Sequence, residues 1–243
     1  MNESVYCREF TLENVHLDRF ERLKSAFLLY FIQEISGEHA SILGASWEDL
    51  AKKNLFWAII RHRIDITRMP TAGETLRLET WPMPTTRTAY PRATVAYDEQ
   101  GNEVFRSVAL WVLMDKTTRA MVLPGKSDVI VPGIQRDIPL EMPGSLPPVA
   151  LKNQVLRQVG YSLLDRNGHM NNTRYLDWID DLLNSDFHAI HTPRQIRLCY
   201  LSEIRENQKA QLSWTLDEDG CLRVEATSEE EGQHRIFGAQ LQF

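Results

Sequence analysis

The chain has 243 residues, of which 43% are hydrophobic and 25% are charged, and its formal net charge is -6. This composition is typical of a soluble globular protein. The negative charge argues against a general nucleic-acid binder, because such proteins normally carry a basic surplus, and no apolar run approaches the ~18 residues of a membrane span.

The first half of the chain is predicted to contain a helix followed by a run of strands. Asp18 and Glu21 have the spacing of a helix N-cap. The helix that follows is expected to stop near Gly37. It carries apolar side chains on one face, namely Phe20, Leu23, Phe27 and Phe31. Alternating apolar and polar residues predict strands over 57–67, 74–81, 88–97 and 104–114.

The second half is predicted to repeat this order after a connection rich in proline and glycine. Residues 124–148 have the composition of an extended linker. Asn171 or Asn172 is the expected N-cap of a helix with an apolar face formed by Tyr175, Leu176, Ile179, Leu182 and Leu183. Strands are predicted over 154–163, 194–202, 207–216, 221–228 and 234–243.

Two segments of the chain match each other in pattern. Residues 70–81 lie without gaps on residues 203–214, at an offset of 133 (214 minus 81), and each segment is a turn followed by an alternating strand that ends in Trp. An apolar helix after a first strand is best buried by an antiparallel sheet wrapped around it. The repeat therefore predicts an α+β chain of two such units.

The most informative polar cluster lies just before the second predicted helix. Asp165, Asn167 and His169 occur within five residues, and Glu203 follows 34 positions after His169 (203 minus 169). An acid, an amide and an imidazole at the start of a helix indicate a catalytic site. The same residues also suit a plain Asn/Gly-rich turn with a helix cap.

Several classes of site lack their signatures. The three cysteines, at positions 7, 199 and 221, form no C-x-x-C pair, so neither a disulfide framework nor a zinc site is indicated, and a reducing cytoplasm is expected. The start MNESVYCREF lacks the basic and apolar regions of a signal peptide. No phosphate-binding, α/β-hydrolase or zincin motif is present, and no cofactor or metal is expected.

The polar cluster resembles the D-x-N-x-H-x-N-N signature of the acyl-ACP thioesterases, the plant FatA/FatB type and its bacterial relatives. Matching residues of the first half are Arg63-Ile64-Asp65-Ile66, Pro70, Glu79-Thr80-Trp81 and Trp111 to Arg119. The resemblance implies a tandem hotdog fold. An N-terminal hotdog (1–123) would hold the acyl chain, 124–148 would link the domains, and a C-terminal hotdog (149–243) would carry the catalytic residues.

The resemblance also implies the reaction, in which acyl-ACP is hydrolysed to a free fatty acid and holo-ACP at the end of fatty acid synthesis. Glu203 would act as general base on water, or attack directly to form an anhydride. Asn167 would hold the water or donate to the carbonyl oxygen, and His169 would polarise the thioester, position water or protonate the thiolate. Asp165 would orient Asn167 or His169. Backbone N–H groups after Asn171 are candidate oxyanion donors.

One departure from the family pattern concerns a possible thiol nucleophile. Plant-type members often carry Cys directly after the catalytic Glu, whereas this chain has Ile204. Cys199 lies on the same predicted strand but has no motif support, and a strand cysteine is usually a small buried apolar side chain.

The family implies an acyl slot between the helix and the sheet of the N-terminal half. Candidate wall residues are Phe27, Phe31, Trp57 and Trp111, which also suit an ordinary core. Acyl carrier protein is strongly acidic, so its docking face would draw on Arg61, Arg63, Arg87, Arg92, Arg197 and Arg205.

Two other functions remain open: an acyl-CoA or aryl-CoA thioesterase on the same fold, and a non-catalytic acyl-binding hotdog. Acyl chain length, carrier preference and oligomeric state are also open, and a homo-oligomer is compatible with the pattern.

Overall fold

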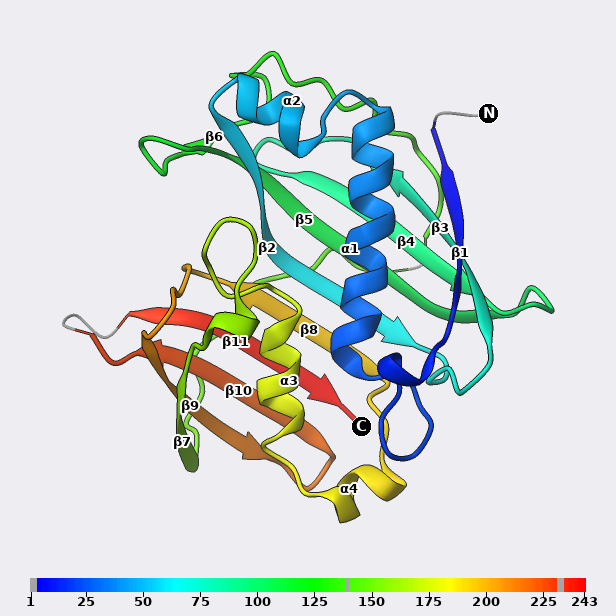
Figure 1. Cartoon of the computed structure of the whole chain (residues 1–243), viewed down its shortest axis with the longest axis vertical. Helices are drawn as coiled ribbons and strands as arrows, with labels where there is room; N and C mark the ends of the chain where they lie inside the picture. Colours follow the sequence, from blue (N-terminus) through cyan, green and yellow to red (C-terminus); the bar gives the residue numbers. More distant parts are fainter. Residues whose placement is uncertain (1–3, 139, 231–233) are drawn as a thin grey trace. The chain divides into compact units, whose positions relative to one another are not determined.

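The computed structural model describes residues 4–138, 140–230 and 234–243. The chain forms two compact units, Met1–Pro143 and Gly144–Phe243, so the division falls inside the proline-rich stretch 124–148. Each unit is an antiparallel sheet with a helix packed on one face (Figure 1). The expected α+β tandem hotdog fold is therefore confirmed.

The first unit contains one long helix and five main strands. The strands follow the order β1-β3-β4-β5-β2, and a short sixth strand pairs with β5. Their bounds are β1 Tyr6–Thr11, β2 Leu55–Ile66, β3 Thr75–Pro82, β4 Tyr90–Tyr97, β5 Glu103–Asp115 and β6 Met121–Val122. The helices are α1 Ser25–Ile42 and α2 Trp47–Lys52, and Asn14–His16 forms a 3-10 turn (η1).

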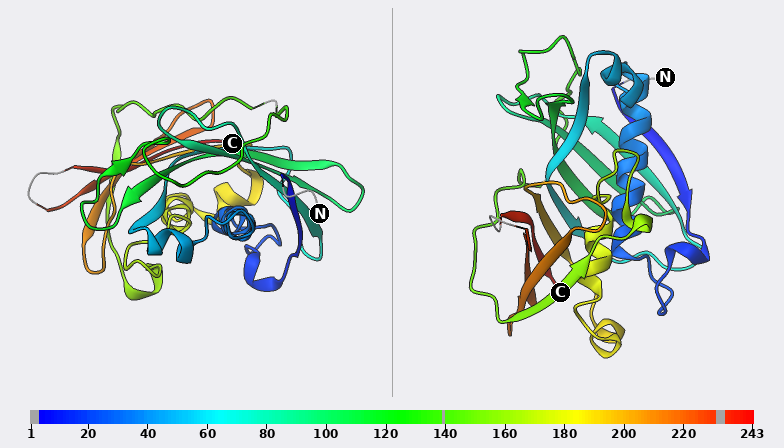
Figure 2. Two further views of the ribbon diagram at one scale, coloured as in Figure 1. Left: turned by 90° about the horizontal axis from the view of Figure 1, so that it is seen from above. Right: turned by 60° about the vertical axis from the view of Figure 1, so that its left-hand side comes forward.

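Both faces of the first sheet are covered (Figure 2). Helix α1 lies over one face and buries apolar side chains at helical spacing, among them Leu28, Ile32 and Ile35. On the other face, Ile134 and Ile138 pack against a cluster formed by Trp81, Ala93 and Val95. Burial on both faces explains why strand β4 is buried along nearly its whole length.

The expected start and stop of the first helix are wrong. Asp18 accepts hydrogen bonds from the backbone N–H groups of Phe20 and Arg22, and Glu21 has a left-handed φ of 60°, so this segment is a closed loop. The helix begins only at Ser25 and continues through Gly37. A helical glycine costs about 1 kcal/mol, and burial of the side chains on both sides of Gly37 outweighs that cost.

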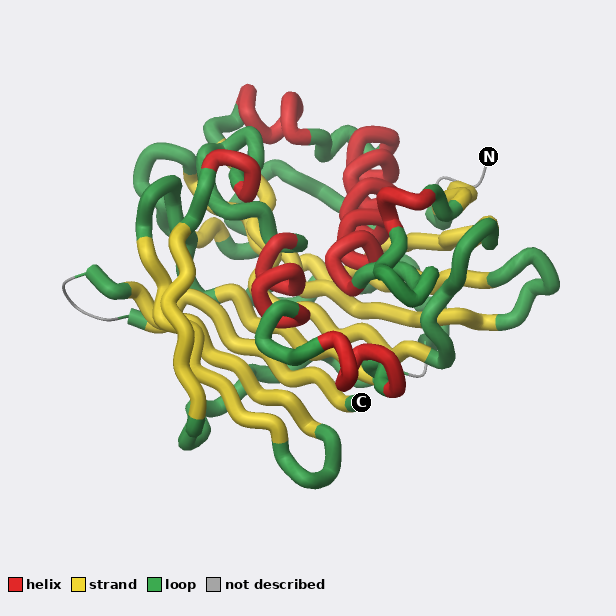
Figure 3. The backbone as a smooth tube through the Cα atoms, turned by 60° about the horizontal axis from the view of Figure 1, so that its bottom comes forward, coloured by secondary structure: helices red, strands yellow, loops and turns green. Residues whose placement is uncertain are grey.

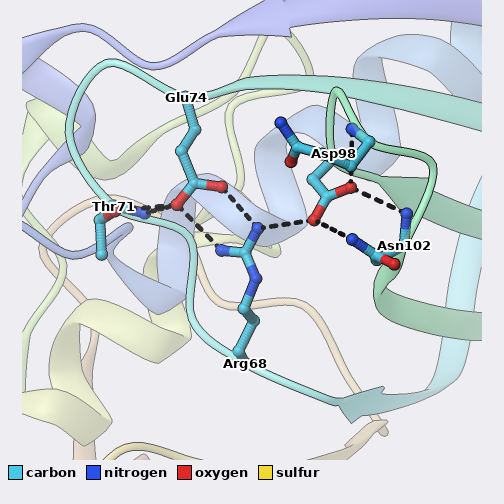
Figure 4. Close-up of polar contacts among 6 residues, drawn as sticks. Arg68, Thr71, Glu74, Asp98 and Asn102 are labelled. Atoms are coloured by element: carbon cyan, nitrogen blue, oxygen red, sulfur yellow. Dashed lines mark hydrogen bonds and ion pairs between the residues drawn. The ribbon is translucent and has the colours of Figure 1, made fainter.

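A polar network in the first unit ties the β2–β3 connection to the β4–β5 turn (Figure 4). Arg68 donates to both carboxylate oxygens of Glu74, at 2.9 and 2.7 Å, and to Asp98 at 3.3 Å. Glu74 also accepts from the backbone N–H of Thr71 at 2.7 Å. Burial alone would raise the pKa of Glu74, but hydrogen bonds from Arg68 and Thr71 outweigh it and lower the pKa.

The second unit repeats the arrangement with shorter helices (Figure 3). Its strands follow the order β8-β11-β10-β9-β7. Their bounds are β7 Asn153–Gln158, β8 Gln195–Tyr200, β9 Lys209–Leu216, β10 Cys221–Ser228 and β11 Arg235–Gln242. The helices are α3 Arg174–Asp180 and α4 Ser185–Ile190, and Tyr161–Leu163 forms a 3-10 turn (η2).

Two elements of the second unit differ from the expectation. The strand predicted over 154–163 ends at Gln158, and the chain then turns at Gly160 into η2. The helix predicted to include Leu182 and Leu183 ends at Asp180, and a separate helix begins after Asn184, whose side chain accepts from the N–H of Phe187. This second cap divides what the apolar pattern presents as one helix.

No helix within residues 4–138, 140–230 and 234–243 is both long and apolar enough to cross a membrane.

Candidate functional site

A tight loop before α3 holds three of the four predicted catalytic residues. One carboxylate oxygen of Asp165 accepts from the backbone N–H groups of Asn167 (2.8 Å) and His169 (3.3 Å), and the other accepts from Asn167 Nδ2 (3.3 Å). Gly168 provides the left-handed φ of 76° that closes the turn. Asp165 therefore orients the amide of Asn167 and the backbone of His169.

The predicted partner of this loop, Glu203, lies against it. His169 Nε2 is 3.1 Å from Glu203 Oε2. The backbone fixes this approach, because Met170 N donates to Ile204 O at 2.9 Å and His169 forms an antiparallel bridge with Arg205. Two segments 34 residues apart (203 minus 169) thus bring an imidazole, a carboxylate and an amide into one region of the second unit.

Burial distinguishes the members of this group. The His169 side chain is 11% exposed, whereas that of Glu203 is 40% exposed, and Asn167 is also exposed. No direct hydrogen bond joins Asn167 to Glu203 among the described residues. Asn167 is instead linked to Glu203 through the loop, because Asn167 lies two residues before His169, which contacts Glu203. The arrangement is an imidazole–carboxylate pair, with an exposed amide two residues away on the same loop.

The same loop occurs in the first unit, 147 residues earlier (165 minus 18). Asp18 N donates to Arg22 O at 2.7 Å, as Asp165 N donates to His169 O at 2.8 Å. Asp18 also accepts from the N–H groups two and four residues later, as Asp165 does. The Asp residue is therefore a structural part of this loop wherever the loop occurs.

The duplicated loop shows which side chains are specific to the second unit. Phe20 stands at the position of Asn167 and Arg22 at that of His169. In the following turn Leu23 N donates to Pro70 O, as Met170 N donates to Ile204 O. Pro70 and Ile204 are therefore equivalent positions. The residues just before them, Met69 and Glu203, are then also equivalent, at an offset of 134 (203 minus 69). The gapless match predicted at 133 is thus displaced by one residue, and only the second unit has the amide, imidazole and carboxylate together.

An aromatic cluster that the sequence analysis did not place in the site lies close enough for the charge of Glu203 to act on Tyr175. The ring of Tyr175 on α3 stacks on Phe237 at 4.5 Å and contacts Tyr200 edge-on at 5.8 Å. Burial, and then the charge of Glu203, raises the pKa of Tyr175, and burial raises the pKa of Tyr200. Both hydroxyls stay protonated, and that of Tyr200 donates to Asn172 O at 3.1 Å, which braces the start of α3.

Two of the N–H groups expected as oxyanion donors at the start of α3 are already hydrogen-bonded. Asn171 Oδ1 accepts from Thr173 N at 2.9 Å, and Asn171 O accepts from Arg174 N at 2.9 Å. The predicted cap is therefore wrong: Thr173 is the N-cap residue, no side chain caps the helix, and Asn171 instead closes the turn that precedes it. Because both N–H groups are already used, Thr173 and Arg174 are poor oxyanion donors.

A thiol nucleophile is not part of this site. Cys199 is buried, and its Sγ lies 3.7 Å from Gly144 O. On strand β8 it is adjacent to Tyr200, whose ring faces α3, so the Cys199 side chain points to the opposite face of the sheet. The described residues also contain no group of three or more His, Cys, Asp or Glu side chains that could hold a metal ion.

The four candidate wall residues of the acyl slot fall into two groups in the first unit. Phe27 and Phe31 pack with His16, at centroid distances of 4.9 and 5.1 Å. Trp57 and Trp111 pack against another cluster, which contains Ala45, Leu50, Leu55, Tyr90, Leu113 and Val129. Phe27 and Phe31 lie in the first half of α1, whereas Trp57 donates to Ala45 O just beyond the end of that helix, so the two groups lie toward opposite ends of α1.

The arginines expected to form a docking face are not equivalent. Arg87 and Arg205 are exposed, but Arg92 is only 7% exposed and cannot meet a partner protein. Arg63 is paired with Asp65 and Glu141 at 3.2 and 2.9 Å, which reduces the positive charge that it presents. Arg92 is therefore removed from the predicted docking residues.

Comparison with known protein families gives two consecutive matches. The acyl-ACP thioesterase N-terminal domain matches residues 3–125, and the acyl-ACP thioesterase C-terminal domain matches residues 150–240.

Individual relatives agree with these family matches. The chain is 26% identical over 190 residues to a palmitoyl-acyl carrier protein thioesterase of Gossypium hirsutum, covering 72% of this chain and 46% of the relative. It is 25% identical over 229 residues to oleoyl-acyl carrier protein thioesterase 1 of Arabidopsis thaliana, covering 84% and 62%. Both relatives are chloroplastic, and the chain spans about half to three fifths of their length.

The fold also agrees with a solved structure. A crystal structure of an acyl-ACP thioesterase from Bacteroides thetaiotaomicron superposes with a TM-score of 0.90 over 100% of both chains, at 23% identity.

Proposed function

The chain belongs to the acyl-ACP thioesterase family, and we propose that it hydrolyses the thioester of acyl-ACP to a free fatty acid and holo-ACP, which terminates fatty acid synthesis. The observation that carries this proposal is the 3.1 Å contact between His169 Nε2 and Glu203 Oε2, on the loop that also carries Asn167. Among the residues that the structure describes, this group occurs in the second unit alone, although both units contain the loop.

In the proposed mechanism Glu203 is the general base. Its carboxylate takes a proton from water while the water oxygen attacks the thioester carbon, and the tetrahedral intermediate then expels the thiolate of the carrier. His169 holds the carboxylate in one orientation through Nε2. The leaving group needs little assistance, because a thiol has a pKa of about 8.5.

Asn167 positions the attacking water in this scheme. Its Nδ2 donates to Asp165 at 3.3 Å, which fixes the amide plane. The exposed carbonyl oxygen of the amide can then accept a hydrogen bond from the water. Asp165 is assigned a positioning role, because its hydrogen bonds go to the loop and its counterpart Asp18 makes the same backbone contacts in a loop that lacks the other three groups.

The two units are assigned different tasks. The N-terminal hotdog (1–123) is proposed to hold the acyl chain near Phe27, Phe31, Trp57 and Trp111, the C-terminal hotdog (149–243) to carry catalysis, and residues 124–148 to connect them. Acyl carrier protein is the proposed partner, with exposed arginines such as Arg87 and Arg205 as docking candidates.

A reducing location such as the cytoplasm is proposed from the cysteines. Cys7, Cys199 and Cys221 are all free thiols.

The decisive experiment is steady-state hydrolysis of an acyl-ACP series beside matched acyl-CoAs, with the wild type and Glu203→Gln. Removing a general base commonly lowers kcat by about 10²- to 10⁴-fold. Glu206→Gln is the matched control, because Glu206 is an exposed carboxylate in the same turn.

The outcomes separate the candidate functions. Hydrolysis of acyl-ACP that is lost in Glu203→Gln and kept in Glu206→Gln supports the proposal. A wild type that prefers acyl-CoA would make the protein a CoA thioesterase. Binding of acyl chains without any hydrolysis would make it a non-catalytic hotdog, and full activity in Glu203→Gln would refute the site.

A further inference from the structure

A row of polar side chains lies in the core of the first unit, beneath the second half of α1. Strand register places His62, Ala109 and Arg92 side by side, and the next row on the same face contains Ser107 and Thr94. These residues face α1, because Arg92 Nη1 lies 3.0 Å from Nδ1 of His39 on that helix.

Arg92 is a buried cation without an acidic partner among the described residues. It is 7% exposed, and its polar contacts go only to His39 Nδ1 and Thr80 Oγ1, at 3.0 and 3.4 Å, neither of which belongs to an acidic side chain. Burial lowers the pKa of Arg92 to about 10, so the guanidinium is still charged at neutral pH. A buried charge is costly unless its hydrogen-bonding capacity is met, and most donors of this guanidinium make no bond to a described residue.

Neighbouring polar atoms on this face are also unsatisfied. Both ring nitrogens of His62, the hydroxyls of Ser107 and Tyr90 and the indole N–H of Trp111 are buried without a hydrogen-bond partner among the described residues. Tyr90 pairs with Trp111 in the sheet, two positions along the strands from the pair Arg92 and Ala109. In native proteins most buried polar groups are bonded, so a cluster of exceptions in one place indicates a ligand or a catalytic role.

The position of this polar belt relates it to the acyl chain. By the polar belt we mean His62, Tyr90, Arg92, Ser107 and Trp111. Phe31 packs on Phe10 of β1 at 4.7 Å, near the first half of α1. Trp57 donates to Ala45 O, just beyond the end of α1, at 3.0 Å. His39, which contacts Arg92, lies between these points along the helix, so an acyl chain that touches both groups of wall residues crosses the belt.

We propose that the polar belt is a specificity-determining site for acyl chains that carry an acceptor oxygen away from the thioester, with Arg92 as its principal donor. This inference rests on the proposed function, in which the first unit holds the acyl chain. A hydroxyl, oxo or carboxyl oxygen would accept from Arg92 and from the Trp111 indole, whereas a plain hydrocarbon chain would leave these donors unbonded. Sites built to bond a polar group reject analogues that lack it.

The test uses matched pairs of free fatty acids, which differ only by an oxygen substituent moved along the chain. Calorimetric binding to the intact protein is measured first, because it does not depend on catalysis. We expect the best-placed oxygenated acid to bind at least ~10-fold more tightly than its plain partner, as expected for a hydrogen bond to a charged group. Hydroxy, oxo and terminal carboxy series identify which oxygen the belt prefers.

Arg92→Met is expected to abolish the preference. Arg77→Met is the matched control, because Arg77 lies on the opposite face of the sheet beside Glu79 and its side chain is 42% exposed. If Arg92→Met does not fold, Ser107→Ala, which keeps the charge and removes an unbonded hydroxyl of the belt, is expected to reduce the preference. Equal or weaker binding of every oxygenated acid by the wild type, or a preference that persists in the folded belt variants, would overturn the proposal.

Hydrolysis of the matching acyl-ACPs then separates this inference from the function on which it rests. A preference in kcat/KM that follows the binding preference supports both. Binding selectivity without any hydrolysis refutes the thioesterase function and leaves the polar belt as an acyl-binding site.

Discussion

Replacing His62 with leucine tests the buried polar face through the pH dependence of stability. The His62 side chain is 0% exposed, and neither ring nitrogen has a hydrogen-bond partner among the described residues. Burial lowers the pKa of His62 to about 3, well below its value of about 6.5 in an unfolded chain. The imidazole is therefore neutral in the folded protein throughout the range from about pH 5 to pH 8.

The sign of the effect follows from this difference. Below about pH 6.5 the unfolded chain takes up a proton at His62 while the folded protein does not, so acid favours unfolding. Below that pH each further unit lowers the unfolding free energy by about 1.4 kcal/mol. Because the effect begins only near pH 6.5, the change from pH 7 to pH 5 removes about 2 kcal/mol of unfolding free energy. For a chain of this length that corresponds to a decrease in Tm of about 4–8 °C.

The assay is thermal and urea unfolding of the wild type and His62→Leu, without ligand, at intervals from about pH 8 to pH 5. Other titrating groups contribute equally to both proteins, so the quantity compared is the slope with pH rather than the stability at one pH. Between pH 7 and pH 5 we expect the unfolding free energy of the wild type to fall by about 2 kcal/mol more than that of His62→Leu. Parallel pH profiles would refute the assignment of a buried neutral imidazole.

Three further predictions concern the duplicated loop and the polar network of the first unit. Asp165→Ala should lower kcat by about 100-fold, because it misplaces Asn167 and His169 in the site. Asp18→Ala, in the equivalent loop of the first unit, should lower Tm but leave kcat within about twofold. An equal loss of kcat in both variants would contradict the comparison of the two loops. Gly168→Ala should cost about 1 kcal/mol in unfolding free energy because of its φ of 76°, and an unchanged Tm would argue against that backbone. Arg68→Met should cost about 1 kcal/mol at pH 7. Because folding lowers the pKa of Glu74, this difference should be kept above the ordinary pKa of a glutamate, about 4.3, and be lost at lower pH once Glu74 is protonated in the folded protein; a difference that persists after protonation would contradict the ion pair.

The strands and the main site contact could be predicted from sequence because each has a recognisable signal. Alternating polarity predicts β10 at Cys221–Ser228 without error and β3 at Thr75–Pro82 within one residue. The family signature, rather than any local pattern, pairs the loop that carries His169 with the distant turn that carries Glu203, and the structure brings these two side chains into contact.

Other features depend on packing that no local pattern encodes. The passage of α1 through Gly37 is decided by burial of its neighbours. Asp18 has the spacing of a helix cap, but its carboxylate accepts from the backbone N–H of Phe20 in a closed loop. Aspartate is favoured both at helix N-caps and in such turns, so the sequence does not distinguish them. The sequence favours a surface position for Arg92 because most arginines lie there, and only the strand register places it under α1.

The repeated loop has a consequence for engineering. Its backbone closes with the same hydrogen bonds whether the following positions are occupied by Phe20 and Arg22 or by Asn167 and His169. The turn thus tolerates different side chains without a change of shape. Writing Phe20→Asn, Arg22→His and Met69→Glu into the first unit would install a second amide, imidazole and carboxylate on a scaffold that already has the required backbone.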